Sequence, residues 1–524
     1  MPSETDPLLH EESDSERSAR GISTPAADSD ETAVPNPISP YYIPVVAFLA
    51  RLCFFIPTTT IVEILLELTC RLYWNYSGTE PPISEDKCTH PSVRQYFIIL
   101  NTAVGVMDGL GGLVMYGPLG RLSGKYGRRS MMVVLTVLII LNSLCLIGAY
   151  KLAIGFTAPL LLLWLVLASA TGPWEIDIMT VMYVVDTTAT KKRTSMLSVV
   201  MGCAYVAGIP AFAIGGWLTT WTQDDAVVYW AVIGIALFLL AYIAFILPES
   251  FDHARREKLA SEWKNERERS GRGTGYLNSA LETFFQHLTL LKPHRDPVTG
   301  RWNLRLLWCG VHAFLSALAS GYLINSILIY LALHMRYKPD ENGYTLTVSA
   351  IATGFSLIIV TPLLIKWGRH FYGFAYKHTT NPSVKRDTRN SLINAKLDKH
   401  LAIFGWTIDI LSMAFLPLAR TRMQVTISLM VLGASYFRIS TFRSVVVASG
   451  DSIRSGEILA AIQTLTALGT ALSGLVLGSV LSASIDTFPG LVFLVYSAIA
   501  FVSVVALCLI KDSDRYIAPL ATDS

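Results

Sequence analysis

The stretch Gly120-Arg121-Leu122-Ser123-Gly124-Lys125-Tyr126-Gly127-Arg128-Arg129 is a short basic segment between two long apolar stretches, residues 95–117 and 130–150. Each apolar stretch exceeds 18 residues and carries almost no charge, which is enough to cross a ~30 Å hydrocarbon core as a helix. Basic residues between two spans favour the cytosolic side of a membrane. The segment therefore predicts a cytosolic turn between two membrane helices.

Similar apolar stretches occupy most of the chain. Hydrophobic residues make up 52% of the sequence, charged residues only 15%, and the mean hydropathy is +0.45. Soluble proteins carry about 25% charged residues, so the composition excludes a set of soluble domains. We predict an all-α membrane protein with twelve transmembrane helices. Their approximate positions are 43–67, 95–117, 130–150, 156–184, 196–220, 226–247, 306–333, 345–365, 400–418, 424–446, 457–482 and 488–510.

The opening segment has a second copy. Lys125-Tyr126-Gly127-Arg128 follows the second span and Lys366-Trp367-Gly368-Arg369 follows the eighth, so both copies are expected at cytosolic turns. Repetition of this kind predicts two pseudo-symmetric six-helix halves, with a substrate site between them. The predicted organisation is a tail at 1–40, a half at 41–248, a central loop at 249–305, a half at 306–511 and a tail at 512–524.

Lysines and arginines gather in alternate loops. The long central loop and the loops after spans 2, 4 and 8 are basic, whereas the opposite loops are short and hold few basic residues. The positive-inside rule therefore places both termini in the cytosol. The N-terminal tail contains Glu4-Thr5-Asp6-Pro7-Leu8-Leu9, in which Glu4, Leu8 and Leu9 fit an acidic dileucine signal read by sorting adaptors. We expect a multi-pass protein of the plasma membrane, with the vacuolar membrane as the alternative.

The first loop on the non-cytosolic side holds two candidate modifications. Asn75-Tyr76-Ser77 is a sequon, so Asn75 is a candidate glycosylation site. Cys70 and Cys88 lie at the two ends of the same loop and are the cysteines that face an oxidising compartment together. They are therefore the disulfide candidates.

The basic segment resembles the signature between helices 2 and 3 of the major facilitator superfamily. That signature runs glycine, three residues, aspartate, arginine, any residue, glycine, arginine, and lysine or arginine. Matching residues are Gly120, Leu122, Gly127, Arg128 and Arg129, and Lys125 keeps the positive charge of its position. Gly124 stands where the family has aspartate, which puts in doubt the lock that this aspartate provides in the outward-open state.

Other segments resemble the family as well. Asp186 and Arg193, after the fourth span, resemble its acid-then-arginine turn, and Gly208-Ile209-Pro210 resembles the helix 5 motif of antiporters. Glu67 to Tyr73, followed by Cys88, resembles fungal transporters related to the proton-coupled folate transporter branch.

This resemblance implies a secondary active transporter that moves a small organic molecule by alternating access and is coupled to a proton gradient. Export of a secondary metabolite or toxin is one expectation; uptake or vacuolar transport of a nutrient, or a sensor of the same fold, are the alternatives. No loop holds a catalytic constellation and no span a metal-ligand cluster, so an enzyme, a metal and a cofactor are not expected. No basic cluster with interleaved aromatics suggests nucleic acid.

Ionisable residues inside spans are costly and mark substrate or proton pathways. They concentrate in spans 1, 4, 7 and 10, which the family uses to line its central cavity. The candidate pathway residues are Arg51, Glu175, Asp177, His312, Asn325 and Arg438.

Depth along the helices suggests which of these charges meet. Arg51 and Glu175 both lie ~12–16 Å from the cytosolic ends of their spans and are expected to pair. Asp409 and Arg438 form a second candidate pair. Glu175 and Asp177 are two residues apart and so cannot face the same way. Asp108 lies between Gly105 and Gly109, where a role in close helix packing is expected.

Overall fold

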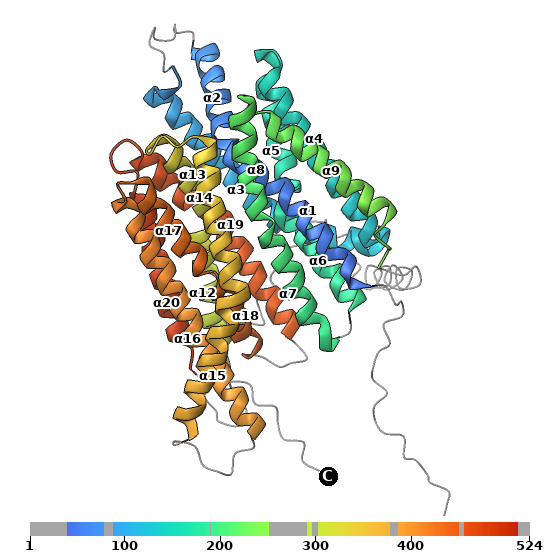
Figure 1. Cartoon of the computed structure of the whole chain (residues 1–524), viewed down its shortest axis with the longest axis vertical. Coiled ribbons are helices and arrows are strands. Elements are labelled where there is room, and N and C mark those ends of the chain that lie inside the picture. Colours follow the sequence, from blue (N-terminus) through green and yellow to red (C-terminus); the bar gives the residue numbers. More distant parts are fainter. Residues whose placement is uncertain are drawn as a thin grey trace, which may run out of the picture.

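The computed structural model describes residues 39–77, 87–188, 190–250, 291–295, 302–377, 386–449 and 455–511. Long helices run side by side along the long axis of the molecule (Figure 1). The N-terminal half holds η1 (Pro40–Tyr42), α1 (Ile43–Phe55), η2 (Ile56–Thr59), α2 (Ile61–Ser77), η3 (Lys87–Thr89), α3 (Pro91–Tyr126), α4 (Arg128–Lys151), α5 (Ile154–Ala170), α6 (Pro173–Thr187), α7 (Thr190–Val206), α8 (Gly208–Thr222) and α9 (Val227–Phe245).

The C-terminal half follows a short antiparallel hairpin, β1 (His294–Arg295) paired with β2 (Trp302–Asn303). Its helical segments are α12 (Arg305–Ser320), α13 (Leu323–Leu333), α14 (Pro339–Phe355), η4 (Ser356–Val360, a π turn), α15 (Thr361–Lys377), α16 (Arg386–Phe415), η5 (Leu416–Leu418), α17 (Arg422–Ala434), α18 (Phe437–Val447), α19 (Ser455–Ser484) and α20 (Leu491–Cys508).

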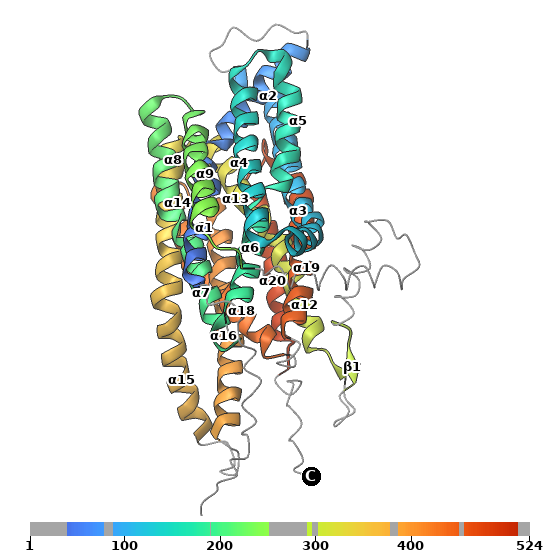
Figure 2. The ribbon, with the colours of Figure 1, turned by 90° about the vertical axis from the view of Figure 1, so that its right-hand side faces the viewer.

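These segments give the predicted twelve-helix layout. Among the described residues, eleven helices are long and apolar enough to cross a membrane, and α3 lies where the remaining span is expected. We name the two ends of the bundle by their landmarks: the disulfide end, near Cys70, and the motif end, near Gly127. Figure 2 shows the same bundle from the side, with α2 and α5 reaching the disulfide end and α15 and α16 reaching the motif end.

Six of the twelve spans are interrupted in the part of the chain that the structure describes, whereas the sequence predicts interruptions of the fourth and fifth, at Pro173 and Pro210. The interruptions lie between α1 and α2, α5 and α6, α7 and α8, α12 and α13, and α17 and α18, and at the η4 turn between α14 and α15. Proline lacks the backbone N–H that a helix interior requires, and it explains three of them: Pro57 lies in η2, Pro173 starts α6, and Pro362 follows η4.

At two of these interruptions a side-chain hydroxyl forms a hydrogen bond with a backbone N–H or carbonyl group. Ser473 on α19 accepts from the backbone N–H of Tyr322 at 2.9 Å, directly after the break at the end of α12. Thr171 donates to the carbonyl of Leu167 at 2.8 Å at the end of α5. Buried backbone groups left without partners are expensive, so these contacts stabilise the breaks.

The two halves meet along two seams built on glycine. One seam joins α3 to α19, and a Cβ on Gly109 would lie 2.4 Å from the Cα of Ala471. The other joins α8 to α14, where a Cβ on Gly216 would lie 3.2 Å from the Cα of Gly343. Small residues let membrane helices approach this closely. The close packing predicted for Gly105 and Gly109 is confirmed, and Gly474 and Gly478 on α19 make similarly close contacts with α3.

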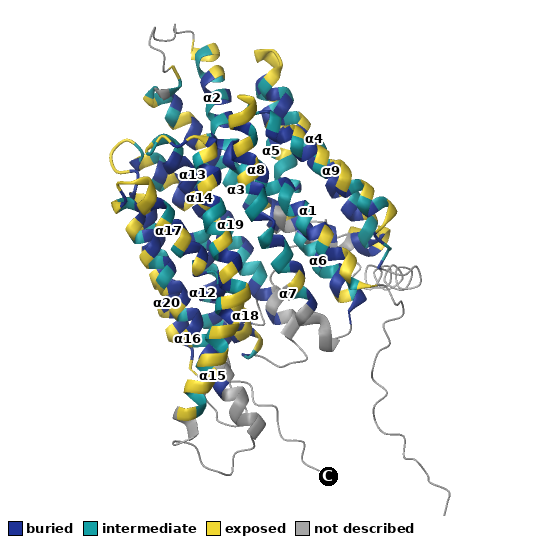
Figure 3. Cartoon of the chain, in the orientation of Figure 1, coloured by how far each residue is buried: buried dark blue, intermediate teal, exposed yellow. Residues whose placement is uncertain are grey.

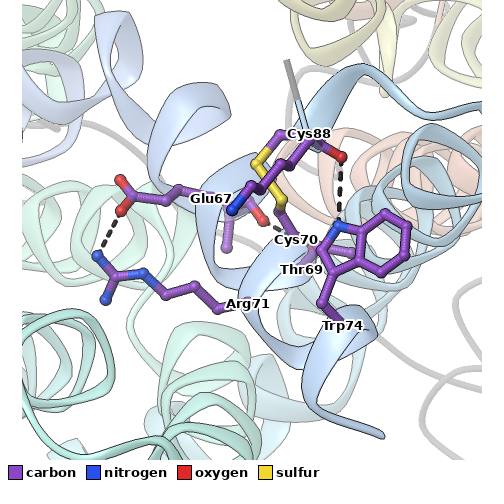
Figure 4. Close-up of a disulfide and its surroundings, with 8 residues drawn as sticks. Glu67, Thr69, Cys70, Arg71, Trp74 and Cys88 are labelled. Carbon is purple, nitrogen blue, oxygen red and sulfur yellow. Dashed lines mark hydrogen bonds and ion pairs between the residues drawn. A yellow bond between two sulfur atoms is a disulfide. The ribbon is translucent and has the colours of Figure 1, made fainter. Parts of the chain in front are cut away.

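Cys70 and Cys88 form the predicted disulfide, which ties α2 to the segment before α3 (Figure 4). Beside it, the indole of Trp74 donates to the carbonyl of Lys87 at 3.2 Å. Asn75 is exposed in the last turn of α2, and its glycosylation stays a prediction. Glu4, Leu8 and Leu9 lie outside the described residues.

Candidate functional site

A buried ion pair joins the first and fourth spans. Arg51 on α1 donates to the carboxylate of Asp177 on α6, and their side chains are only 13% and 15% exposed. The sequence predicts Glu175 as the partner of Arg51, and that prediction is wrong. α6 begins at Pro173, so Glu175 lies in its first turn and Asp177 lies ~200° further around the helix. The turn that carries Asp177 toward α1 therefore carries Glu175 away from it.

Glu175 faces α3 instead. Its residue is 1% exposed, and its Oε2 atom has no hydrogen-bond partner in the part of the chain that the structure describes. A Cβ on Gly172 would lie 2.8 Å from Glu175 Oε2 and 2.9 Å from Asp108 Oδ1. The two carboxylates therefore flank Gly172 and are no more than about 6 Å apart. Sequence reasoning gave Asp108 only a packing role, since helix contacts between distant residues leave no mark in the sequence.

Residues of the other half reach the Arg51–Asp177 pair. Arg443 on α18 is close enough to Asp177 to interact with it electrostatically, and Tyr436 is likewise close to Arg51. The rings of Tyr205 on α7 and Tyr436 meet across the halves, with centroids 5.4 Å apart. The N-terminal charges thus lie at the interface where the family architecture places a substrate site.

A second ion pair lies inside the C-terminal half. Asp409 on α16 and Arg438 on α18 are 2.9 Å apart and are 0% and 4% exposed at their side chains, which confirms the predicted pair. Tyr496 on α20 also donates to Asp409, and Arg438 donates to Ser435 at 2.7 Å. The guanidinium of Arg438 lies 4.5 Å from the ring centroid of Trp406. Both charges are therefore enclosed within one half.

The two remaining pathway candidates lie elsewhere. His312 on α12 is fully buried; its Nδ1 atom is 2.9 Å from the carbonyl of Ser503, and its ring packs on Trp406 and Phe442. Asn325 on α13 is half-buried beside α3, where a Cβ on Gly105 would lie 3.7 Å from its amide nitrogen. The structure does not bring either residue to the Arg51–Asp177 pair.

The family motif forms a sharp turn at Gly127. This residue has φ 100° and ψ 157°, a conformation that only glycine adopts readily, and it separates α3 from α4. Arg128 donates from Nε to Asp186 at 3.0 Å, and Arg129 donates from Nε to the carbonyl of Ile243 at 3.0 Å. The turn thereby ties the start of α4 to the ends of α6 and α9.

Glu249 completes this turn; the sequence places it in Leu247-Pro248-Glu249-Ser250, which resembles the family's end of helix 6, but gives it no role here. Its two carboxylate oxygens accept from the backbone N–H groups of Arg128 and Arg129, at 2.8 and 3.2 Å. A carboxylate at a helix N-terminus satisfies unpaired donors and complements the helix dipole. Of the other motif residues, Gly120 and Lys125 lie in α3 and Arg193 lies in α7.

The second copy of the segment is not a turn. Lys366 to Arg369 lie within α15, which continues to Lys377, so the expected cytosolic turn at this position is wrong. A Cβ on Gly368 would lie 2.3 Å from Leu397 Cδ1 on α16. Glycine here leaves room for the Leu397 side chain between the helices, whereas Gly127 is needed for its backbone conformation. Asp451 and Arg454 follow the tenth span as Asp186 and Arg193 follow the fourth, which predicts a repeat of that turn. Both lie outside the described residues.

Comparison with known proteins agrees with this architecture. A model of the Major Facilitator Superfamily matches residues 45–376. The chain belongs to the major facilitator superfamily. It is 27% identical over 396 residues to the major facilitator-type transporter psiT1 of Psilocybe cyanescens, a match that covers 72% of this chain and 83% of that protein.

Solved structures share the fold. The human organic anion transporter MFSD10 superposes with a TM-score of 0.57 at 14% identity, covering 90% of this chain and all of the other. The xylose transporter XylE from E. coli gives 0.56 at 12% identity, covering 89% and 96%. The chain is thus a small-molecule transporter of this superfamily and not an enzyme. Among its described residues no group of histidine, cysteine and carboxylate side chains could hold a metal ion.

Proposed function

We propose that the chain is a proton-coupled secondary transporter of a small organic molecule, and that Glu175 and Asp108 together take up and release the proton. The observation that carries this proposal is the approach of the two carboxylates at Gly172, with Glu175 fully buried. Two negative charges this close in an apolar site repel, so the pair is most stable with one proton between them. A change in access to Gly172 then loads or releases that proton.

Asp177 has a separate role in this proposal. It lies between Arg51 of its own half and Arg443 of the other half. When the halves move apart at this level, Asp177 keeps Arg51 and loses the influence of Arg443. Substrate that binds between the halves meets these charges, so binding and the arrangement of the halves are coupled.

We propose export of a small organic molecule, such as a secondary metabolite or toxin, from the plasma membrane, with both termini cytosolic. Support comes from the antiporter-like Gly208-Ile209-Pro210, which begins α8 directly after the break in the fifth span. Uptake, vacuolar transport and nutrient sensing stay as alternatives, and the folate-branch resemblance and the sorting role of Glu4, Leu8 and Leu9 stay predictions.

The test begins by profiling exported and retained compounds in a deletion strain to find a transported compound. Purified protein in liposomes is then assayed for accumulation driven by a pH gradient and for exchange without a gradient. We expect Glu175→Gln to abolish gradient-driven accumulation and to retain exchange, because the glutamine binds no proton.

Asp108→Asn should shift the pH dependence of transport, since the glutamate then lacks its charged neighbour. Glu67→Gln serves as the matched control, because Glu67 is a half-exposed carboxylate paired with Arg71 at the disulfide end. If both Glu175→Gln and Asp108→Asn keep the wild-type pH dependence, the proton is carried elsewhere.

A further inference from the structure

The eighth span is longer than a membrane requires. Pro339–Phe374 is one candidate span of 36 residues, which is about 54 Å of helix at 1.5 Å per residue. The hydrocarbon core is ~30 Å thick, and the bilayer with its headgroups ~40–45 Å. α15 therefore extends past the core at the motif end, and Figure 1 shows its lower part reaching beyond α12 and α18.

A groove of about 1250 Å³ lies along this extension. Its lining includes three aromatic side chains that are about 70% exposed, Trp367, Phe371 and Phe374. It also includes three exposed basic or imidazole side chains, Lys366, Arg369 and His370. The exposed surface of lower α15 is visible in Figure 3.

The depth of these residues matches lipid headgroups. Pro339 starts α14 at the disulfide end, and Lys366 lies 27 residues further along, about 40 Å away. This distance places Lys366 and Arg369 at the headgroup level of the opposite leaflet. Trp367, between these two residues, matches the belt of aromatic side chains that membrane proteins form at the headgroup level.

The charges that face the groove are mainly positive. α16 packs against α15 and brings Asp398 near Arg369. Asp398 is also held by Ser444, which donates to its carboxylate at 2.5 Å. Among the side chains that the structure describes here, Asp398 is the carboxylate set against Lys366, Arg369 and His370, which leaves positive charge on their exposed side.

We propose that this groove binds an anionic phospholipid, with its phosphate between Lys366 and Arg369 and its acyl chains against Leu357 and Ile365, which line the groove on the side of the bilayer centre. Cations placed over an apolar, aromatic surface at headgroup depth complement a negatively charged headgroup that carries hydrocarbon tails. The proposal is independent of proton coupling, because it concerns the outer face of one helix in the C-terminal half.

The test measures lipid retained by the purified full-length protein, by native mass spectrometry after incubation with phosphatidylserine or phosphatidylcholine. We expect the wild type to retain phosphatidylserine at least fivefold more than phosphatidylcholine. The double variant Lys366→Gln/Arg369→Gln should lose that preference, since each cation near an anionic surface contributes roughly fivefold in affinity. The control Arg420→Gln/Arg422→Gln removes two charges from exposed residues at the disulfide end and should retain it.

Four outcomes would overturn the proposal. Equal retention of the two lipids by the wild type would leave no anionic preference to explain. Undiminished phosphatidylserine retention in the Lys366/Arg369 variant would place the lipid elsewhere. Displacement of phosphatidylserine by millimolar inorganic phosphate, or occupation of the groove by a second copy of the chain, would show that it is not a phospholipid site.

Discussion

Two arginine–aspartate pairs among the described residues, one in each half, are built differently. Arg438 and Asp409 are enclosed within the C-terminal half, with Tyr496 and Ser435 as further partners. Arg51 and Asp177 keep 13% and 15% of their side chains exposed, with Arg443 of the opposite half nearby. The comparison favours the pathway role proposed above for the pair that lies near the interface of the two halves. The enclosed pair holds three helices of one half together.

Breaking the enclosed pair should have the largest effect on stability. Asp409→Leu leaves a buried arginine without its counter-ion, which costs ~3–5 kcal/mol. The double variant Asp409→Leu/Arg438→Met removes both charges and should recover most of the unfolding temperature and also transport. Thermal unfolding of the purified protein in detergent, followed by tryptophan fluorescence, orders the three proteins. A double variant no more stable than the single one would show that the pair does more than hold helices.

For the interface pair, Arg51 and Asp177, we expect a smaller loss of stability and a loss of transport that the double variant does not recover. Arg51→Met should lower the unfolding temperature less than Asp409→Leu does, because the remaining Asp177 is partly exposed and lies near Arg443. Adding Asp177→Leu should restore stability but not transport, since the charges themselves act between the halves. Recovery of transport in this double variant would make the two pairs equivalent and would end the distinction drawn between them.

Of the three ion pairs, an exposed one should have the smallest effect on stability. Lys151 and Asp224 are 2.8 Å apart at the disulfide end, and their side chains are 48% and 41% exposed. Such pairs contribute ~0–1 kcal/mol, so Asp224→Asn should barely change the unfolding temperature at neutral pH.

The pH dependence of this pair has a definite sign. The hydrogen bond from Lys151 lowers the pKa of Asp224 below its usual 3.8. Its small stabilisation is therefore present above pH 3.8 and is lost as the pH falls through the lowered pKa. Unfolding temperatures of wild type and Asp224→Asn should converge in that acidic range. A difference that grows on acidification would contradict the assigned partner.

Much of the fold follows from the sequence because hydropathy and charge act locally. Apolar length predicts the spans, and the cysteines at the ends of one loop predict the disulfide. The motif pattern predicts the turn at Gly127. The same pattern around Gly368 does not form a turn, because there the segment continues as helix and the glycine packs against the Leu397 side chain of a neighbouring helix.

The site was less predictable for a related reason. Depth along a helix predicts which charges lie at one level, and it correctly joined Asp409 to Arg438. It does not give the rotation of a helix, which for α6 is fixed by the break at Gly172 and Pro173. The sequence therefore predicts Glu175 as the partner of Arg51, whereas the actual partner is Asp177, two residues further along α6. Asp108 beside Glu175 depends on how α3 packs on α6, which no spacing within either segment records.

The six interrupted spans also determine which faces of the helices cannot lie against lipid. Lipid offers no hydrogen bonds, so an open backbone group at membrane depth is tolerated only against protein or a wet cavity. Each interruption must therefore turn its freed amides and carbonyls toward the interior of the bundle, as Tyr322 does toward Ser473. The interruption at Gly172 lies beside Glu175 and Asp108, so the same condition applies to the backbone next to these two carboxylates. The backbone groups freed beside those carboxylates must therefore face protein or water, so this side of Gly172 is closed to lipid whatever compound is transported.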